Sequence, residues 1–348
     1  MSQSRERKTF DSSIVRHKPG SAEVLHRTEA GRNGRYSNAR KGTRPQEELQ
    51  GQEHESAAAK LKRKALEKTP QKFKNPSNLQ VRIRTGAVYI SLTVLCVLFS
   101  NASAAIYLSV LSAICAGEFY FMLRSDAKLP NEFLGIGAAA LFPLAMWLFG
   151  GVGVGLLFVA FTIVLLLWYI TYLRARVSDV AISLFGAVYT GLLMSFAMAI
   201  RMALPSFWGG VLVVGIFCTI WGNDAFAYLA GSRFGKHKMA PAISPKKSWE
   251  GFVAGIAFSM AFWCLLTLIP GVSMSIAQAL VFGAICGGAG VVGDLVESRI
   301  KRNSGFKDSG TIMPGHGGLL DRCDSQFLVI VCAALLLIAG GCIPNVLF

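Results

Sequence analysis

The sequence predicts an all-α, polytopic integral membrane protein with about nine transmembrane helices, preceded by a disordered basic N-terminal tail. Of its 348 residues, 53% are hydrophobic and only 16% are charged, a balance that excludes an ordinary soluble enzyme. The charge is also unevenly spread, because residues 1–84 hold 20 Lys and Arg against 9 Asp and Glu. The chain therefore divides into a basic polar segment and a strongly apolar one.

The first predicted domain, residues 1–78, is a basic and mostly disordered cytoplasmic tail. It is poor in aromatic residues, so it cannot bury enough apolar surface to offset its chain entropy. A short helix fits the segment Glu55–Glu67. Two interpretations of the tail stay open: attraction to anionic lipid headgroups, or a solvated extension without a specific role. The first apolar run begins only after residue 84, so the first membrane helix is the expected insertion signal.

The second predicted domain, residues 79–348, is a polytopic membrane catalytic domain. A helix needs about 20 apolar residues to cross a bilayer, and apolar segments of this length recur throughout the domain. The nine expected spans are 84–100, 102–123, 133–150, 152–173, 180–203, 207–230, 251–269, 275–293 and 325–346.

The distribution of Lys and Arg supports this count independently. If the tail is cytoplasmic and the helices alternate, the cytoplasmic loops hold 14 Lys and Arg, whereas the opposite face holds only Arg201. Such an excess is typical of cytoplasmic loops. We therefore expect a multi-pass protein of the cell membrane with a cytoplasmic N-terminus. Two charge-dense loops, residues 232–250 and 294–324, fall on the cytoplasmic side.

A stripe of small residues is expected on the eighth span. Gly283, Gly287, Gly290 and Gly293 follow one another at spacings of three and four. Residues at these spacings share one helix face, and small ones let neighbouring helices approach closely. Packing alone is the favoured explanation for Gly283 and Gly287.

The first charged loop offers a binding site for an anion. Asp224 lies in the last turns of a span, where an unpaired carboxylate is costly, so a partner or a metal is expected. Lys246 and Lys247 follow Ser244-Pro245, a pair that predicts a helix N-cap and first helical position. Two lysines in the first turn of a helix lie unfavourably close to the positive end of the helix dipole. A bound anion would offset this, and a triphosphate is a suitable anion. The alternative is a basic loop that only follows the topology.

The second charged loop begins with a patterned helix face. Glu297, Ser298 and Lys301 come three, four and seven residues after Asp294. If the eighth helix continues past the membrane, these four residues share one face. The face fits a metal-binding carboxylate backed by a phosphate-binding lysine.

The end of the same loop supplies two more aspartates. Asp321 and Asp324 are three residues apart and would face the same way at the start of the ninth helix. With Asp294 they could hold one or two hard divalent cations, because Mg²⁺ prefers oxygen ligands and keeps waters for substrate phosphates. The glycines around His316 let backbone amides approach an anion closely. His316 itself is a candidate phosphate donor or general acid, with a structural histidine as the alternative.

The combination of metal-binding acids, basic side chains and a glycine-rich turn indicates phosphoryl or nucleotidyl transfer at the membrane surface. Metal ions would neutralise the phosphate oxygens and align the reacting groups. Basic side chains would share the charge of a triphosphate. The residues expected to do so are Lys246, Lys247, Lys301, Arg302, Lys307 and Arg322.

Two groups of motifs carry a family resemblance. The downstream group is Ser298-Arg-Ile-Lys-Arg, Lys307-Asp308, Pro314-Gly-His-Gly-Gly and Asp321-Arg-Cys-Asp324. The upstream group is Asp224-Ala-Phe-Ala-Tyr, Gly231-Ser-Arg-Phe-Gly-Lys and Ser244-Pro-Lys-Lys-Ser-Trp-Glu-Gly. Over residues 220–326 the chain thereby resembles the phosphatidate cytidylyltransferases, also called CDP-diacylglycerol synthases. It departs mildly from that pattern at Met313 and Cys323.

The resemblance implies that CTP and phosphatidate give CDP-diacylglycerol and pyrophosphate in phospholipid biosynthesis, with Mg²⁺ required. It implies Asp294, Asp321 and Asp324 as metal ligands, with Lys301 and His316 as further catalytic residues. The implied nucleotide-binding residues are Asp224, Lys246, Lys247, Ser248, Arg302, Lys307, Asp308 and Arg322. It also implies a homodimer among membrane lipids and no nucleic-acid partner, and it leaves a second, monovalent cation open.

Other functions make different demands on the sequence. A CTP-dependent kinase of a long-chain alcohol such as dolichol would need a positioned base to activate a hydroxyl group. A CDP-alcohol phosphotransferase would carry a different acidic pattern. A transporter or channel would place its acids deeper in the membrane, where only Asp224 and Glu118 are candidates. A structural scaffold has no need for clustered aspartates beside a glycine-rich turn.

Overall fold

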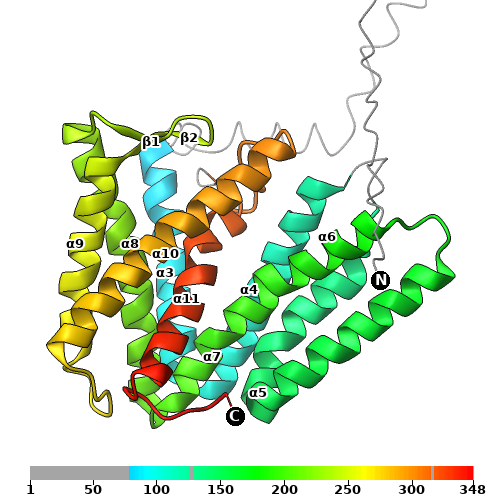
Figure 1. Cartoon of the computed structure of the whole chain (residues 1–348), viewed down its shortest axis with the longest axis horizontal. Helices are drawn as coiled ribbons and strands as arrows, with labels where there is room; N and C mark the ends of the chain where they lie inside the picture. Colours follow the sequence, from blue (N-terminus) through cyan, green and yellow to red (C-terminus); the bar gives the residue numbers. More distant parts are fainter. Residues whose placement is uncertain (1–77, 125–128, 315–316, 348) are drawn as a thin grey trace, which may run out of the picture. The chain divides into compact units, whose positions relative to one another are not determined.

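The fold is taken from a computed structural model that describes residues 78–124, 129–314 and 317–347 (Figure 1). The predicted disordered tail, up to residue 77, and the short helix suggested at Glu55–Glu67 lie outside the described residues. His316 also lies outside them, so its role stays a prediction.

The described chain is helical except for short loops and one β-hairpin. Its helices are α3 (Asn78–Phe99), α4 (Asn101–Leu123), α5 (Glu132–Thr171), α6 (Val177–Ala187), α7 (Leu193–Ala203), α8 (Ser206–Phe234), α9 (Trp249–Leu266), α10 (Ile276–Asn303) and α11 (Leu320–Ala339). A π-helical turn, Val188–Leu192, joins α6 to α7. Eight segments of the described chain are long and apolar enough to cross a membrane. The prediction of an all-α membrane protein is confirmed.

The count of eight differs from the predicted nine at one place, because the spans expected at 133–150 and 152–173 are joined in α5. A straight helix of 40 residues would be about 60 Å long, roughly twice the hydrocarbon thickness of a bilayer. Gly150 interrupts the helical geometry with φ 65° and ψ −160°, and the two parts of α5 run in different directions from there (Figure 1). Each part has the length of a single crossing.

Gly150→Ala is expected to destabilise the protein by about 1–3 kcal/mol, because this backbone region is essentially reserved for glycine. Thermal unfolding of the detergent-solubilised protein measures the effect. Gly155→Ala is the matched control, since Gly155 lies in the same helix with open space around it and alanine favours helix over glycine. Equal stability of Gly150→Ala and the wild type would contradict the strained bend.

Two helices, α9 and α11, pack closely against the glycine stripe of α10, as predicted. Gly283 and Gly287 lie against α9, where a Cβ on Gly283 would come within 2.7 Å of the Met260 Cα. Gly293 lies against α11, where a Cβ would come within 2.7 Å of the Asp324 carbonyl oxygen. The absence of side chains here allows close packing, and it places the first turns of α11 directly on α10.

The hairpin between α8 and α9 consists of β1 (Lys238–Ala240) and β2 (Ser244–Ser248). The prediction that Ser244-Pro245 starts a helix is wrong. The backbone stays extended as far as Ser248, since it pairs with β1, and Ser248 caps α9 by accepting the N–H of Gly251 at 3.3 Å. Ser248 is as good an N-cap type as Ser244, and strand pairing decides between them. The hairpin and the C-terminal end of α10 lie at the same end of the helices (Figure 1).

Candidate active site

A cavity of about 660 Å³ lies between α8, the hairpin, α9 and α10. Its volume falls within the range of small-ligand sites. The predicted site residues that line it are Asp224, Lys246, Lys247, Ser248 and Asp294. The structure therefore brings the first charged loop and the start of the second charged loop together around one space, which we call the charged pocket.

The two lysines of β2 have different surroundings in the charged pocket. The Nζ of Lys247 lies 2.7 Å from Oδ2 of Asp294 and donates to the carbonyl of Val291 at 3.3 Å. The other oxygen of Asp294 accepts the Ser298 hydroxyl at 3.0 Å. Lys246 also lines the pocket but is exposed to solvent. Lys247 thus orients Asp294, and Lys246 offers its charge to the pocket.

Further along α10, three buried charges form a compact group, the Lys301 cluster (Glu297, Lys301 and Asp321). The Nζ of Lys301 lies 2.5 Å from Glu297 Oε2 and 2.5 Å from Asp321 Oδ1. The side chains are 12%, 0% and 6% exposed for Lys301, Glu297 and Asp321. Oδ2 of Asp321 also accepts the backbone N–H groups of Ser309 at 3.0 Å and Gly318 at 2.8 Å. Such additional hydrogen bonds are what make a buried ion pair tolerable.

The predicted shared face of α10 is confirmed by these contacts. Ser298 bonds Asp294 across four residues, and Lys301 pairs with Glu297 across four more. The face connects the charged pocket with the Lys301 cluster along a single helix.

Asp324 is the third predicted metal ligand and is only 9% exposed. Its charge interacts with those of Asp294 and Asp224. Asp224 in turn interacts with the positive charges of Lys247 and Arg322. With the ion pairs of the Lys301 cluster and of Lys247 with Asp294, these electrostatic interactions involve five carboxylates and three cations. When all of them are ionised, two negative charges remain to be balanced.

This donor set fits a hard divalent cation such as Mg²⁺, because it offers carboxylate oxygens with excess negative charge. Among the described residues, no three Asp, Glu, His or Cys side chains already converge to hold a metal ion. Both oxygens of Asp321 are engaged, one by Lys301 and the other by two backbone N–H groups. The assignment of Asp294, Asp321 and Asp324 as metal ligands therefore stays a prediction.

Four other predicted phosphate- or nucleotide-binding residues lie at the surface. Arg302, Lys307, Asp308 and Arg322 are exposed, and they are not among the described residues that line the charged pocket. Arg302 donates to the Phe306 carbonyl at 3.3 Å. Arg322 interacts electrostatically with Asp224, which lines the pocket. Roles for all four in nucleotide binding stay predictions.

The sequence did not reveal that Glu118 connects α4 with the loop before α11 and with the start of that helix. This residue lies within α4 and is 6% exposed, yet its carboxylate accepts three hydrogen bonds from residues around the start of α11. The available signal was a single acid in an apolar span, which by itself suggests function. The sequence pattern could not show which loop meets it, because the two segments are about 200 residues apart.

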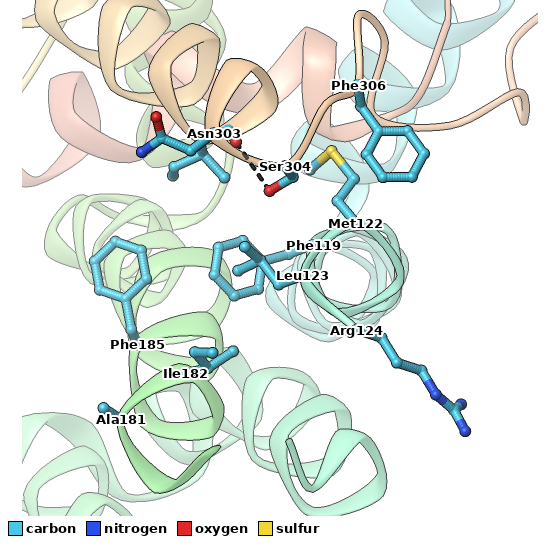
Figure 2. A pocket seen from close by; sticks show the side chains of 11 residues that line it. Phe119, Met122, Leu123, Arg124, Ala181, Ile182, Phe185, Asn303, Ser304 and Phe306 are labelled. Atoms are coloured by element: carbon cyan, nitrogen blue, oxygen red, sulfur yellow. Dashed lines mark hydrogen bonds between the residues drawn. The ribbon is translucent and has the colours of Figure 1, made fainter. Parts of the chain in front are cut away.

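A second cavity, of about 490 Å³, lies between α4, α6 and the C-terminal end of α10. Its lining is mainly apolar (Figure 2) and includes Phe119, Met122, Leu123, Ile182, Phe185, Ile300 and Phe306. Arg124 lies at its edge, with its guanidinium directed away from the cavity (Figure 2) and 3.2 Å from Glu132. This lining suits hydrocarbon better than a triphosphate, so the charged pocket is the candidate active site.

Known proteins of one family are similar to most of this chain. Residues 80–339 match the model of the cytidylyltransferase family. The chain is 31% identical over 290 residues to phosphatidate cytidylyltransferase 4, chloroplastic, of Arabidopsis thaliana, covering 75% of this chain and 73% of the relative. It is 34% identical over 207 residues to phosphatidate cytidylyltransferase 5, chloroplastic, of the same plant, covering 53% and 51%.

A bacterial relative is similar over a shorter stretch. Phosphatidate cytidylyltransferase of Pseudomonas aeruginosa is 38% identical over 155 residues, which cover 41% of this chain and 57% of the relative. The chain thus spans about half the length of some of the curated relatives that it matches. Because the family match extends from α3 to the end of α11, the chain belongs to the cytidylyltransferase family.

Proposed function

We propose that this protein transfers the cytidylyl group of CTP to phosphatidate, forming CDP-diacylglycerol and pyrophosphate for phospholipid biosynthesis. The observation that carries the proposal is the charged pocket, in which lysines and aspartates line one space beside the buried Lys301 cluster. Such a mixture suits two anionic substrates that meet with a cation. The names of the relatives from Arabidopsis thaliana and Pseudomonas aeruginosa support the choice of substrates.

The proposed reaction needs positioning more than it needs a nucleophilic side chain. A phosphate oxygen of phosphatidate forms a bond to the α-phosphorus of CTP, and the bond from that phosphorus to the bridging oxygen of the β-phosphate breaks. The leaving group is pyrophosphate. A phosphate monoester is already an anion at neutral pH, so a strong general base is not required. The protein supplies alignment and charge balance.

The contacts support a separate role for each of the charged residues. Lys246, exposed at the pocket wall, would bind the triphosphate, and Lys247 would hold Asp294 in place. Lys301 would fix Asp321 at the start of α11. A Mg²⁺ ion held by Asp294 and Asp324, with Asp321 as a third proposed ligand, would draw negative charge from the phosphate oxygens. A second, monovalent cation remains part of the proposal.

We further propose that the protein lies in the cell membrane with its N-terminus and active site on the cytoplasmic side. The excess of Lys and Arg in alternate loops supports this orientation. The bend at Gly150 supports it as well, because two crossings by α5 keep the alternation that this excess requires. CTP would enter from the cytoplasm and phosphatidate from the surrounding leaflet. A homodimer is also proposed, on the family resemblance.

The purified protein is expected to make CDP-diacylglycerol from CTP and phosphatidate in detergent micelles when Mg²⁺ is present. Chelation with EDTA should stop the reaction, and added Mg²⁺ should restore it, because the site's carboxylates and the phosphates of CTP are the oxygen ligands that Mg²⁺ prefers. Lipid products are separated by chromatography and identified by mass spectrometry. A parallel reaction offers a polyprenol instead of phosphatidate. Turnover of the polyprenol without turnover of phosphatidate would contradict the proposal and favour a lipid kinase.

A further inference from the structure

Glu118 contacts the active-site loop from a distant helix. The residue belongs to α4, yet its Oε1 accepts the backbone N–H of Leu319 at 3.0 Å, and its Oε2 accepts that of Leu320 at 2.8 Å. Oε2 also accepts the hydroxyl of Ser309 at 3.0 Å. An ionised carboxylate is an acceptor only, and these three donors satisfy it. Glu118 is therefore a buried acid whose described contacts converge on one place.

That place is the start of α11, which needs an acceptor from elsewhere. Leu319 occupies the N-cap position of α11, and its side chain makes no capping bond. The first N–H groups of a helix have no partner within the helix, and negative charge near them is favourable. Glu118 supplies both the acceptors and the charge. The helix whose first turns carry Asp321 and Asp324 is thus capped by α4.

The loop is shaped to admit this carboxylate. A Cβ on Gly310 would collide with Oε1 of Glu118, and a Cβ on Gly318 would collide with Oε2. Ser309 links the two acids of the region, because its hydroxyl bonds Glu118 while its N–H bonds Asp321. Glu118 and Asp321 therefore hold the same stretch of chain from two sides.

We propose that Glu118 is a positioning residue, which holds Ser309–Gly310 and Gly318–Leu320 so that Asp321 and Asp324 meet α10 in the geometry needed for transfer. The catalytic part of this inference rests on the proposed function. Glu118 lies well outside the motif region at 220–326, in a segment without other predicted site residues. Its neighbour Phe119 points into the apolar second cavity (Figure 2), so the two residues serve different surroundings.

The test compares Glu118→Gln with the wild type in kinetics and in hydrogen exchange. Glutamine has nearly the same volume as glutamate, but an NH₂ group replaces one of the two accepting oxygens. That NH₂ group would face the N–H and O–H groups that donate to Glu118. We expect kcat to fall about 10- to 100-fold, because small displacements of catalytic groups have effects of this size. The KM for CTP should change less than about threefold, since Glu118 is not among the described residues lining the charged pocket. A partial loss of folded protein would also lower the apparent kcat and leave the KM unchanged, so the kinetics are read together with hydrogen exchange.

Hydrogen exchange provides a reading that does not depend on activity. In Glu118→Gln the amides of Leu319 and Leu320 should exchange about tenfold faster or more, because their acceptor is lost. Exchange in the hairpin, residues 238–248, should not change. Ser309→Ala removes one of the three bonds and should give a smaller effect in the same direction. Glu132→Gln is the control, because the partner of Glu132 is Arg124 rather than a residue of the loop.

Each outcome decides the inference. Unchanged exchange at Leu319 and Leu320 would overturn it, even if the wild type makes no CDP-diacylglycerol and the proposed function fails. Faster exchange with an unchanged kcat in an active enzyme would overturn the catalytic part. If Glu118→Gln does not fold, Ser309→Ala replaces it, and a wild-type kcat together with wild-type exchange in that variant would equally overturn the inference.

Discussion

Lys301→Ala is expected to lower the kcat for CDP-diacylglycerol synthesis by about 10²–10³-fold and to destabilise the protein by about 3–5 kcal/mol. Lys301 lies 2.5 Å from both Glu297 and Asp321, and both carboxylates are buried. Its removal leaves two buried carboxylates without a cation, and the position of Asp321 is no longer fixed by an ion pair. Turnover of CTP and thermal unfolding in detergent measure the two effects.

Two further variants separate the loss of chemistry from the loss of stability. Replacing a buried ion pair by neutral groups of similar shape costs much less than removing one partner. The double variant Glu297→Gln/Lys301→Met should therefore regain part of the stability but remain inactive. Arg174→Ala, an exposed cation in the loop after α5, is the control and should behave like the wild type. A Lys301→Ala protein with wild-type stability and activity would contradict the role of the Lys301 cluster.

Asp294→Asn is expected to lower turnover by about 10²–10³-fold while the fold remains intact. The side chain of Asp294 is 33% exposed at the wall of the charged pocket, and an amide oxygen can still accept the Ser298 hydroxyl. The stability should therefore change by less than about 1 kcal/mol. The loss arises because the amide carries no charge to hold Lys247 or to bind a cation.

A Mg²⁺ titration makes this prediction sharper. If Asp294 helps to hold the ion, the Mg²⁺ concentration needed for half-maximal turnover should rise in any residual activity of Asp294→Asn. Glu132→Gln provides the matched control, since it removes one acid from a surface pair and should leave both values unchanged. Wild-type turnover by Asp294→Asn at the wild-type Mg²⁺ requirement would remove Asp294 from the metal proposal.

Regular spacing in the sequence predicted the parts of the site that lie on single helices. The positions of Asp294, Ser298 and Lys301 indicated one face of a helix, and the contacts along α10 follow that face. The glycine stripe predicted close approach, and Gly293 lies directly against α11. Helical periodicity is local, so a sequence alone can reveal it.

Competition between similar signals explains why the predicted helix start at Ser244 is wrong. Ser244 and Ser248 are equally suitable N-caps, and pairing with β1 selects Ser248. The bend at Gly150 separates the two expected spans within α5, and the residue type permits this conformation but does not require it. Glu118 illustrates a further limit, because its partners lie in a loop far along the chain and only the folded structure brings them together.

The most direct measurement of the central claim is the fate of the individual phosphorus atoms of CTP. The purified protein is given phosphatidate, Mg²⁺ and CTP labelled with ³²P in either the α- or the γ-position. Nucleotidyl transfer predicts that the α-label appears in the lipid, as CDP-diacylglycerol, and that the γ-label appears only in pyrophosphate. Recovery of the γ-label in the lipid, with the α-label left in CDP, would show phosphoryl transfer and contradict the account.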